Sequence, residues 1–410
     1  MSNKIILHID MNSYFASCEQ QANPFLRGKP VGVCSYLSKN GCIIASSIEA
    51  KKKGVKTGCR VLEAKILCPE IILLENEPAK YRSITEKIFS ILSEYTDTLE
   101  PYSIDEAFLD LTGWVKDLAE AKNKGEEIRQ RIKQEVGEWL KSSVGISHTR
   151  WLAKFASDIA PKDSVLVIKK NEIDKFLKRP LTDAWGINVR LEARLNALGI
   201  FDLLDLKNYP VTNLMQVLGK MGYYLWANVN GLEGEKVKRG EEIRPKSMGH
   251  TYCLYKKSRD INYLSSILLK LCEKTGRRLR LMRLEAYQIG FGLAYEKGGG
   301  FGGQRQIKSG LFTTASIFSA AFNMMKKAEL ADKVSFLAVS VSNLRLLSKQ
   351  MSLFADNLKE KEINLAMDEI NDKYGEYLVF WGRMWGTDKA ARDRVGFRKT
   401  VDISHLMAGG

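Results

Sequence analysis

Two apolar stretches that carry acids place the strongest constraint on how this chain can fold. KIILHID (residues 4–10) has the pattern of a buried strand and ends on Asp10, and YSIDEAFLD (residues 102–110) contains the adjacent Asp105 and Glu106. Removing a carboxylate from water without giving it a partner is energetically expensive. Both stretches are therefore expected to be strands whose acids come together for a functional reason.

Divalent metal chemistry supplies such a reason. Mg²⁺ prefers carboxylates, backbone carbonyls, water and phosphate oxygens as ligands. Two such ions about 3.5–4 Å apart can activate an attacking hydroxyl and neutralise a leaving phosphate. Adjacent residues of a regular strand point to opposite faces, so Asp105 and Glu106 can face one metal pair only if the backbone turns there. Pro101 and Ser103 favour a turn directly upstream.

The pattern of the chain predicts several parts. The first 166 residues alternate predicted strands and helices, whereas residues 170–232 contain short helical patterns and no convincing strand. Residues 184–206 have the pattern of a helix, a glycine-containing turn and a second helix. Such a hairpin can present N–H groups to a phosphate, and ordinary helical packing explains it about as well. Residues 231–247 are charged and nearly free of large apolar side chains, which indicates a linker.

A basic segment follows this linker. The stretch from Arg244 to Lys349 holds 19 Lys/Arg and 6 Asp/Glu, so 13 units of the net charge of +15 lie there. The segment contains a predicted long helix at residues 261–283 and predicted strands at residues 286–295 and 334–344. A region this basic indicates a polyanionic partner, with nucleic acid as the first candidate and a merely soluble basic domain as the alternative.

Composition excludes some classes of protein. No apolar run approaches the roughly 18 residues of a membrane helix, and the first residues do not resemble a signal peptide. The seven cysteines are odd in number and include no C-x-x-C pair, which argues against a disulfide framework or a zinc site. A cytoplasmic protein with reduced thiols is therefore expected.

Four motifs of the sequence together resemble the Y-family, or translesion, DNA polymerases. HIDMNSYFASCEQ (residues 8–20) and YSIDEAFLD (residues 102–110) carry the resemblance, KKKGVKTGCRVLEAKILCPEIILL (residues 51–74) is similar to the family's small fingers, and SVGISHTRWLAKFASDIA (residues 143–160) to the end of its palm. The linker and the basic segment match the family's DNA-gripping little finger. The fingers pattern is closer to the UmuC-like branch of the family.

The resemblance implies an α+β fold, a multidomain right-hand polymerase with palm, small fingers, helical thumb and a C-terminal α/β little finger. The implied parts are the palm (1–11 and 78–166), fingers (12–77), thumb (167–232), linker (233–244), little finger (245–346) and C-terminal tail (347–410). The implied activity is template-directed, translesion-type DNA synthesis, in which the primer 3′-hydroxyl attacks a dNTP and pyrophosphate leaves. Primer-template DNA and dNTPs are then the substrates, and two Mg²⁺ ions the cofactors.

The resemblance also implies roles for individual residues. The catalytic acids would hold both metals with help from one backbone carbonyl, and these residues are Asp10, Asp105, Glu106 and Met11. Phe15 falls on the steric gate that excludes a 2′-hydroxyl, and Tyr14 would pack beside it; plain core aromatics are the alternative for both. Lys51 and Lys162 are the expected triphosphate contacts, although Pro161 precedes Lys162 here in the reverse of the usual order.

Two further sets of residues concern macromolecular partners. The expected DNA contacts are Arg244, Lys246, Arg277, Arg278, Arg280 and Arg305. QMSLF (residues 350–354) resembles the peptide that docks polymerases on the bacterial sliding clamp, with Gln350 at the pocket rim and Leu353 and Phe354 inside the pocket. A strand end with two core anchors is the alternative. A UmuD-like accessory protein is a further candidate partner.

Two rival functions share some of these features. A nucleotide cyclase would use the same two-metal carboxylates but needs no DNA, and the basic segment argues against it. A DNA-binding or clamp-bound scaffold with a decayed active site would lack turnover, and the presence of all three acids argues against that.

Overall fold

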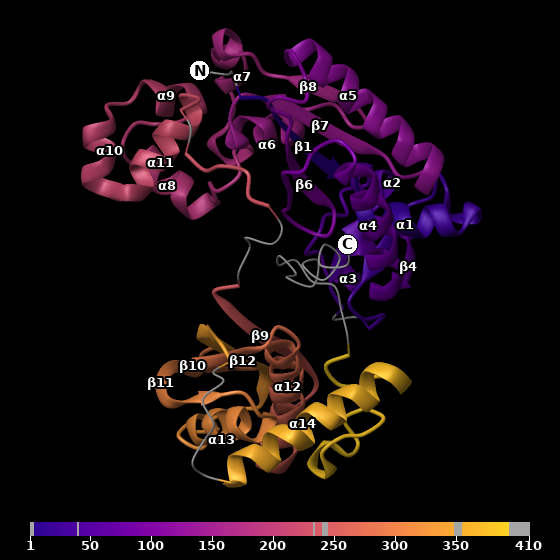
Figure 1. Ribbon diagram of the computed structural model, residues 1–410, viewed down its shortest axis with the longest axis vertical. Helices are drawn as coiled ribbons and strands as arrows, with labels where there is room; N and C mark the ends of the chain where they lie inside the picture. Colours follow the sequence, from indigo (N-terminus) through magenta and orange to yellow (C-terminus); the bar gives the residue numbers. More distant parts are fainter. Residues whose placement is uncertain (1–3, 39–40, 233, 240–244, 348–354, 393–410) are drawn as a thin grey trace. The chain divides into compact units, whose positions relative to one another are not determined.

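The computed structural model describes residues 4–38, 41–232, 234–239, 245–347 and 355–392 (Figure 1). The chain forms two compact units that divide between residues 243 and 244. The first unit contains a five-stranded and a three-stranded sheet, and the second contains a four-stranded sheet.

A five-stranded sheet is the centre of the first unit. Its strands lie in the order β5-β6-β1-β7-β8, in which β1 pairs antiparallel with β6 and β7, and β7 pairs parallel with β8. Their bounds are β1 Ile6–Met11, β5 Leu99–Pro101, β6 Glu106–Asp110, β7 Ser142–Ser147 and β8 Val165–Val167. The two acid-bearing stretches are therefore neighbouring strands, as their patterns predicted.

Helices cover both faces of this sheet. Alternate residues of β1, among them Leu7 and Ile9, join the core that also holds the buried residues of two long helices. On the opposite face Ile6 packs with Phe108 and Ala153. The helices are α4 Pro78–Ser93 and α5 Leu118–Arg131, which continues as one π-helical turn at Ile132–Val136, and on the second face α6 Arg150–Ile159. Because successive side chains of a strand point to opposite faces of the sheet, the even-numbered residues of β1 lie on the face that α6 covers.

A smaller sheet forms the part predicted as fingers. Strand β2 lies between β3, to which it is antiparallel, and β4, to which it is parallel. The elements here are α1 Tyr14–Ala22, a 3-10 turn Pro24–Leu26, β2 Val31–Cys34, β3 Ile43–Ser46, α2 Ile48–Lys52, α3 Val61–Leu67 and β4 Ile72–Glu75. The Ser47 side chain caps α2 by accepting a hydrogen bond from the Ala50 N–H, as a serine before a helix predicts.

Short helices make up the remainder of the first unit. Their bounds are α7 Ile173–Leu177, α8 Val189–Asn196, α9 Leu203–Asn208, α10 Val211–Leu218 and α11 Lys220–Val229, with 3-10 turns at Lys170–Glu172 and Leu181–Asp183. Asn188 has an extended backbone and caps α8 by accepting a hydrogen bond from the Leu191 N–H. The left-handed residue in the turn before α8 is Gly186, with φ +95°.

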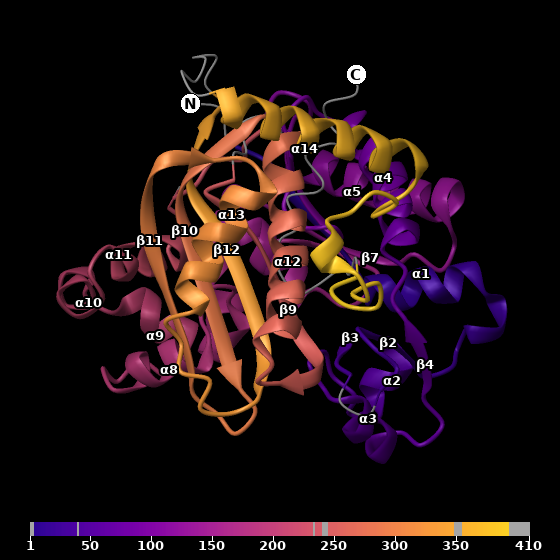
Figure 2. The ribbon, with the colours of Figure 1, turned by 90° about the horizontal axis from the view of Figure 1, so that it is seen from below.

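The second unit has a four-stranded antiparallel sheet with helices against one face (Figure 2). Its strands lie in the order β11-β10-β12-β9. The bounds are β9 Ser247–Ser258, α12 Ile261–Leu281, β10 Leu284–Tyr295, β11 Gly300–Leu311, α13 Thr314–Met325, β12 Val334–Leu346, α14 Ala355–Tyr374 and a 3-10 turn Gly382–Met384. Residues 355–392 thus belong to the same compact unit as the predicted little finger.

Candidate active site

The three predicted catalytic acids meet where β1 and β6 end. Asp10 and Glu106 are directly opposite each other in the β1–β6 pairing, which places both on the α6 face. Asp105 lies in a bend at residues 103–105, directly before β6, and its carbonyl accepts a hydrogen bond from the Met11 N–H at 2.9 Å. The turn that adjacent acids require is therefore present, and Met11 ends β1 beside it.

Two of these acids are held by protein partners. Glu106 Oε2 accepts a hydrogen bond from Lys154 Nζ at 2.7 Å and lies 3.4 Å from His8 Nε2. The Ser103 hydroxyl donates to the Asp105 carboxylate. Within the described ranges, no three His, Cys, Asp or Glu side chains are arranged as a ready metal cluster.

The charges of the acids nevertheless act on one another. Burial, followed by the charges of Asp105 and Glu106, raises the pKa of Asp10 well above its usual range. Burial and then Glu106 raise the pKa of Asp105 to about 6. Burial would also raise the pKa of Glu106, but His8 and Lys154 outweigh it and lower the pKa to about 2. Ionisation of Asp10 and Asp105 is therefore unfavourable in the metal-free site, whereas Glu106 is held ionised by its partners.

This cluster of carboxyl groups fits a divalent cation. The available donors are carboxylate and backbone carbonyl oxygens, the hard ligands that Mg²⁺ takes. Burial and then the neighbouring acids raise the pKa values of Asp10 and Asp105, and a nearby cation would favour the ionised form of both. The donor set and the electrostatics thus suit a metal, while Glu106 is shared with Lys154.

The two expected triphosphate lysines lie near these acids. Lys51 Nζ donates to Ser13 Oγ at 2.8 Å, and Ser13 has left-handed backbone, with φ +52°, directly before α1. Desolvation and then the charge of Lys162 lower the pKa of Lys51. The charge of Lys162 also acts on Asp10. The structure therefore brings together two cations from distant parts of the sequence beside the acids, despite the reversed Pro161-Lys162 order.

Phe15 and Tyr14 lie on the first turn of α1 and are both buried. The Phe15 ring stacks on Tyr81 with 4.6 Å between ring centroids and keeps 8% of its surface exposed. The Tyr14 hydroxyl donates to the Tyr81 carbonyl and lies 2.8 Å from Thr85 Oγ1. Tyr14 packs beside Phe15, at 5.6 Å between ring centroids. Its hydroxyl is fully engaged inside the protein.

The expected DNA contacts differ in their surroundings. Lys246 and Arg305 are exposed, Arg278 is half-buried, and Arg244 lies outside the described residues. Arg277 pairs with Asp372 of α14. These arginines therefore do not form one uniform basic surface.

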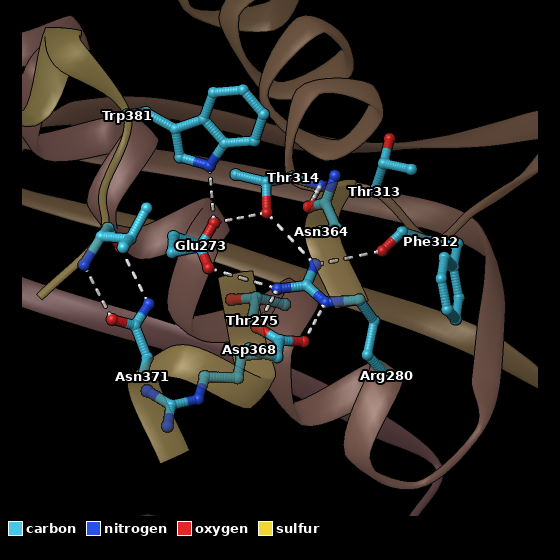
Figure 3. Close-up of polar contacts among 12 residues, drawn as sticks. Glu273, Thr275, Arg280, Phe312, Thr313, Thr314, Asn364, Asp368, Asn371 and Trp381 are labelled. Carbon is cyan, nitrogen blue, oxygen red and sulfur yellow. Dashed lines mark hydrogen bonds and ion pairs between the residues drawn. The ribbon is translucent and has the colours of Figure 1, made fainter. Parts of the chain in front are cut away.

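Arg280 is a correction to the expected DNA contacts. It is 4% exposed, and its guanidinium donates to Asp368 Oδ1 at 2.9 Å and to Glu273 Oε1 at 3.2 Å (Figure 3). Glu273 Oε2 also accepts hydrogen bonds from Thr314 at 2.6 Å and Trp381 at 2.9 Å. With its charge neutralised and its donors used inside the unit, Arg280 has nothing left to offer a phosphate.

The sequence did not reveal the partners of Glu106. His8 is buried and neutral, because burial lowers its pKa to about 4, and its Nδ1 lies 2.6 Å from Ser157 Oγ. Lys154 also lies 3.3 Å from Asp158 Oδ1, one helical turn later. One feature of the sequence could have indicated this arrangement: Lys154 and Asp158 have the i, i+4 spacing of an ion pair on an otherwise buried helix.

Other predictions concern residues or properties beyond this site. Gln350, Leu353 and Phe354 lie outside the described residues. Among the helices that the structure describes, none has the length and apolar character needed to cross a membrane.

Comparisons with known proteins agree with this architecture. The impB/mucB/samB family matches residues 9–158, and its C-terminal domain matches residues 245–353. DNA polymerase IV of Bacillus velezensis is 32% identical over 92% of each chain, and DNA polymerase IV 1 of Bacillus subtilis is 30% identical over 97% of each. A solved chimeric Y-family DNA polymerase aligns with a TM-score of 0.75 at 25% identity, over 83% of this chain and 99% of the chimera.

The first unit has a palm-like sheet with acids at its strand ends and a smaller fingers sheet, and the second unit is basic. These features define a nucleotidyl-transfer enzyme of the polymerase class. The chain belongs to the Y-family DNA polymerases. The predicted family, the α+β right-hand fold and the translesion polymerase function are confirmed. The placement in the UmuC-like branch is not confirmed, because these relatives are named DNA polymerase IV.

Proposed function

We propose that this polymerase extends a primer opposite damaged or undamaged template through two Mg²⁺ ions held by Asp10, Asp105 and Glu106 with the Met11 carbonyl. The observation that carries this proposal is the meeting of the three acids at the ends of β1 and β6, where burial and then the neighbouring acids raise the pKa values of Asp10 and Asp105. When bound, the ions would supply activation of the primer 3′-hydroxyl and neutralisation of the leaving pyrophosphate.

The protein's own residues would orient the incoming nucleotide. Lys51 and Lys162 would pair with the triphosphate, because both lie close enough to the acids for their charges to interact. Phe15 would lie under the sugar, and Tyr81 supports its ring by stacking. Tyr14 would contribute by packing beside Phe15 rather than through its hydroxyl.

DNA would be held through its phosphates without reading of sequence. Lys246 and Arg305 are the exposed candidates in the second unit, Arg278 is a half-buried one, and Arg244 stays a candidate from its sequence position alone. Because such contacts release counterions, binding should weaken steeply with salt. We leave Arg280 out of this set, and Arg277 contributes only if it can leave Asp372.

Primer extension on a plain and an abasic template, with Mg²⁺ and dNTPs, tests the proposal. Wild type should extend both primers, and Asp105→Ala/Glu106→Ala should extend neither while still binding DNA. Glu362→Ala/Glu369→Ala removes the same charge from exposed positions of α14 and should extend like wild type. A folded, DNA-binding wild type that never extends would favour the scaffold instead, and turnover without template would favour the cyclase.

We also propose that QMSLF (residues 350–354) docks on the bacterial sliding clamp. Its support is the resemblance of the peptide and its place directly after the last strand of the basic sheet. A pull-down on immobilised clamp should retain wild type and lose Leu353→Ala/Phe354→Ala. Equal retention of both would remove the proposal. A UmuD-like partner would be supported only if adding such a protein changed primer extension.

A further inference from the structure

Lys154 bridges a predicted metal ligand and a second acid that is not a predicted ligand. Its ammonium lies 2.7 Å from Glu106 Oε2 and 3.3 Å from Asp158 Oδ1. The Lys154 side chain is 9% exposed, the Glu106 side chain is 20% exposed and the Asp158 side chain is 28% exposed. The ammonium therefore sits between an inner carboxylate and an outer one.

The inner position of this ammonium conflicts with metal binding. A metal at Glu106 would place a cation within a few ångströms of the Lys154 charge, where repulsion is strong because the site is partly desolvated. Lys154 has a flexible stem with rotatable donors, and Asp158 already lies within ion-pair reach.

We propose that Lys154 is an exchangeable internal counter-ion, which neutralises Glu106 in the metal-free enzyme and moves outward to Asp158 when a metal binds. This inference rests on the metal role proposed above for Glu106. Asp158 then has a specific function, because it receives the displaced ammonium. The pair tunes the metal affinity of the site and reduces the repulsion among the metal-free acids.

The proposal predicts effects of opposite sign at the two residues. Lys154→Met removes the competitor, so metal should bind tighter while the metal-free enzyme becomes less stable. Asp158→Asn removes the outer position, so Lys154 stays on Glu106 and metal should bind more weakly. A purely structural role for the pair predicts instead that both variants weaken metal binding, because each would disturb the helix beside Glu106.

Mn²⁺ binding to the full-length protein, without DNA or nucleotide, tests this directly by the electron paramagnetic resonance of free Mn²⁺. A unit charge at this distance corresponds to roughly a tenfold change in affinity, tighter for Lys154→Met and weaker for Asp158→Asn. Asp158→Glu should restore most of the wild-type affinity. Lys175→Met, which removes an exposed lysine paired with Glu172, serves as the matched control and should bind like wild type.

The outcomes separate this inference from the proposed metal site. If Asp105→Ala/Glu106→Ala binds Mn²⁺ as wild type does, the metal site itself is wrong. If that double variant loses binding but Lys154→Met binds no tighter than wild type, only the counter-ion role is overturned. If Lys154→Met does not fold, the Mn²⁺ affinities of Lys154→Gln and Asp158→Asn test the counter-ion role in the same way. An unchanged Mn²⁺ affinity in Asp158→Asn would also overturn that role.

Discussion

Asp10 of β1 and Glu106 of β6 are directly opposed in an antiparallel pair, so their carboxylates leave the same face of the sheet. That face is covered by α6, whose Lys154 reaches Glu106. Asp105 joins them because the backbone bends before β6. The register of two strands and one bend thus create a site in which Asp10 and Asp105 are costly to ionise until a cation arrives.

Asp105→Asn should stabilise the metal-free enzyme at neutral pH. The pKa of Asp105 is raised to about 6, so the folded protein binds its proton more tightly than the unfolded chain does. Its ionisation therefore lowers stability as pH rises from about 4 to about 6. In EDTA the variant should melt about 2–4 °C above wild type at pH 7.5, with little difference at pH 4.5.

Differential scanning fluorimetry at the two pH values checks this prediction. Adding Mg²⁺ should stabilise wild type more than the variant, because Asn supplies no charge. An equal gain in melting temperature at both pH values would contradict the titration of Asp105. Asp117→Asn, at the exposed N-cap of α5, is a control for the same substitution outside the site.

Substitutions at Phe15 and Tyr14 should have different effects, one on the choice of sugar and the other on the stability of the core. Phe15→Ala should raise ribonucleotide incorporation at least tenfold relative to dNTPs, if its ring lies under the sugar. Tyr14→Phe removes a hydroxyl bonded to the Tyr81 carbonyl and should cost about 1–2 kcal/mol of stability without changing sugar choice. Single-nucleotide extension with dNTP and NTP, beside urea unfolding, measures both. Unchanged discrimination in Phe15→Ala would assign Phe15 to the core alone.

Asp368 should hold α14 on the second unit. It is 8% exposed and pairs with the buried Arg280, so Asp368→Ala leaves that charge with one acidic partner fewer. The expected cost is about 3 kcal/mol. Hydrogen exchange should speed up in the amides of α14. Asp372→Ala, whose side chain is 59% exposed, should change exchange little, and similar rates in both variants would contradict the prediction.

The strands of the site were readable from the sequence because their signals are local. Apolar stretches with an acid at one end predicted β1 and β6, and Pro101 and Ser103 predicted the bend. Strand β8, an apolar run at Val165–Val167, was missed although the same signal was available. Local patterns thus account for the palm sheet and its acids.

The role of Arg280 could not be read in this way. Arg277, Arg278 and Arg280 look like a phosphate-binding cluster when α12 is considered alone. Arg280 turns inward because Asp368 lies on a helix 88 residues later in the chain. Long-range ion pairing leaves no local signature, and the same holds for Lys154 and Glu106, which are 48 residues apart.

Arg305 and Arg280 should respond differently in DNA binding. Arg305 is exposed on β11, so Arg305→Ala should remove one phosphate contact and lower the slope of log affinity against log salt by about 1. Arg280→Met removes the same charge from a buried position and should leave the slope unchanged in the folded protein. Fluorescence anisotropy on primer-template DNA between 50 and 200 mM salt (about the range in which such contacts dominate) measures the slopes.

Lys246→Ala should behave like Arg305→Ala. A lower slope for Arg280→Met would return Arg280 to the DNA-binding surface, and an unchanged slope for Arg305→Ala would place the phosphate contacts elsewhere in the second unit.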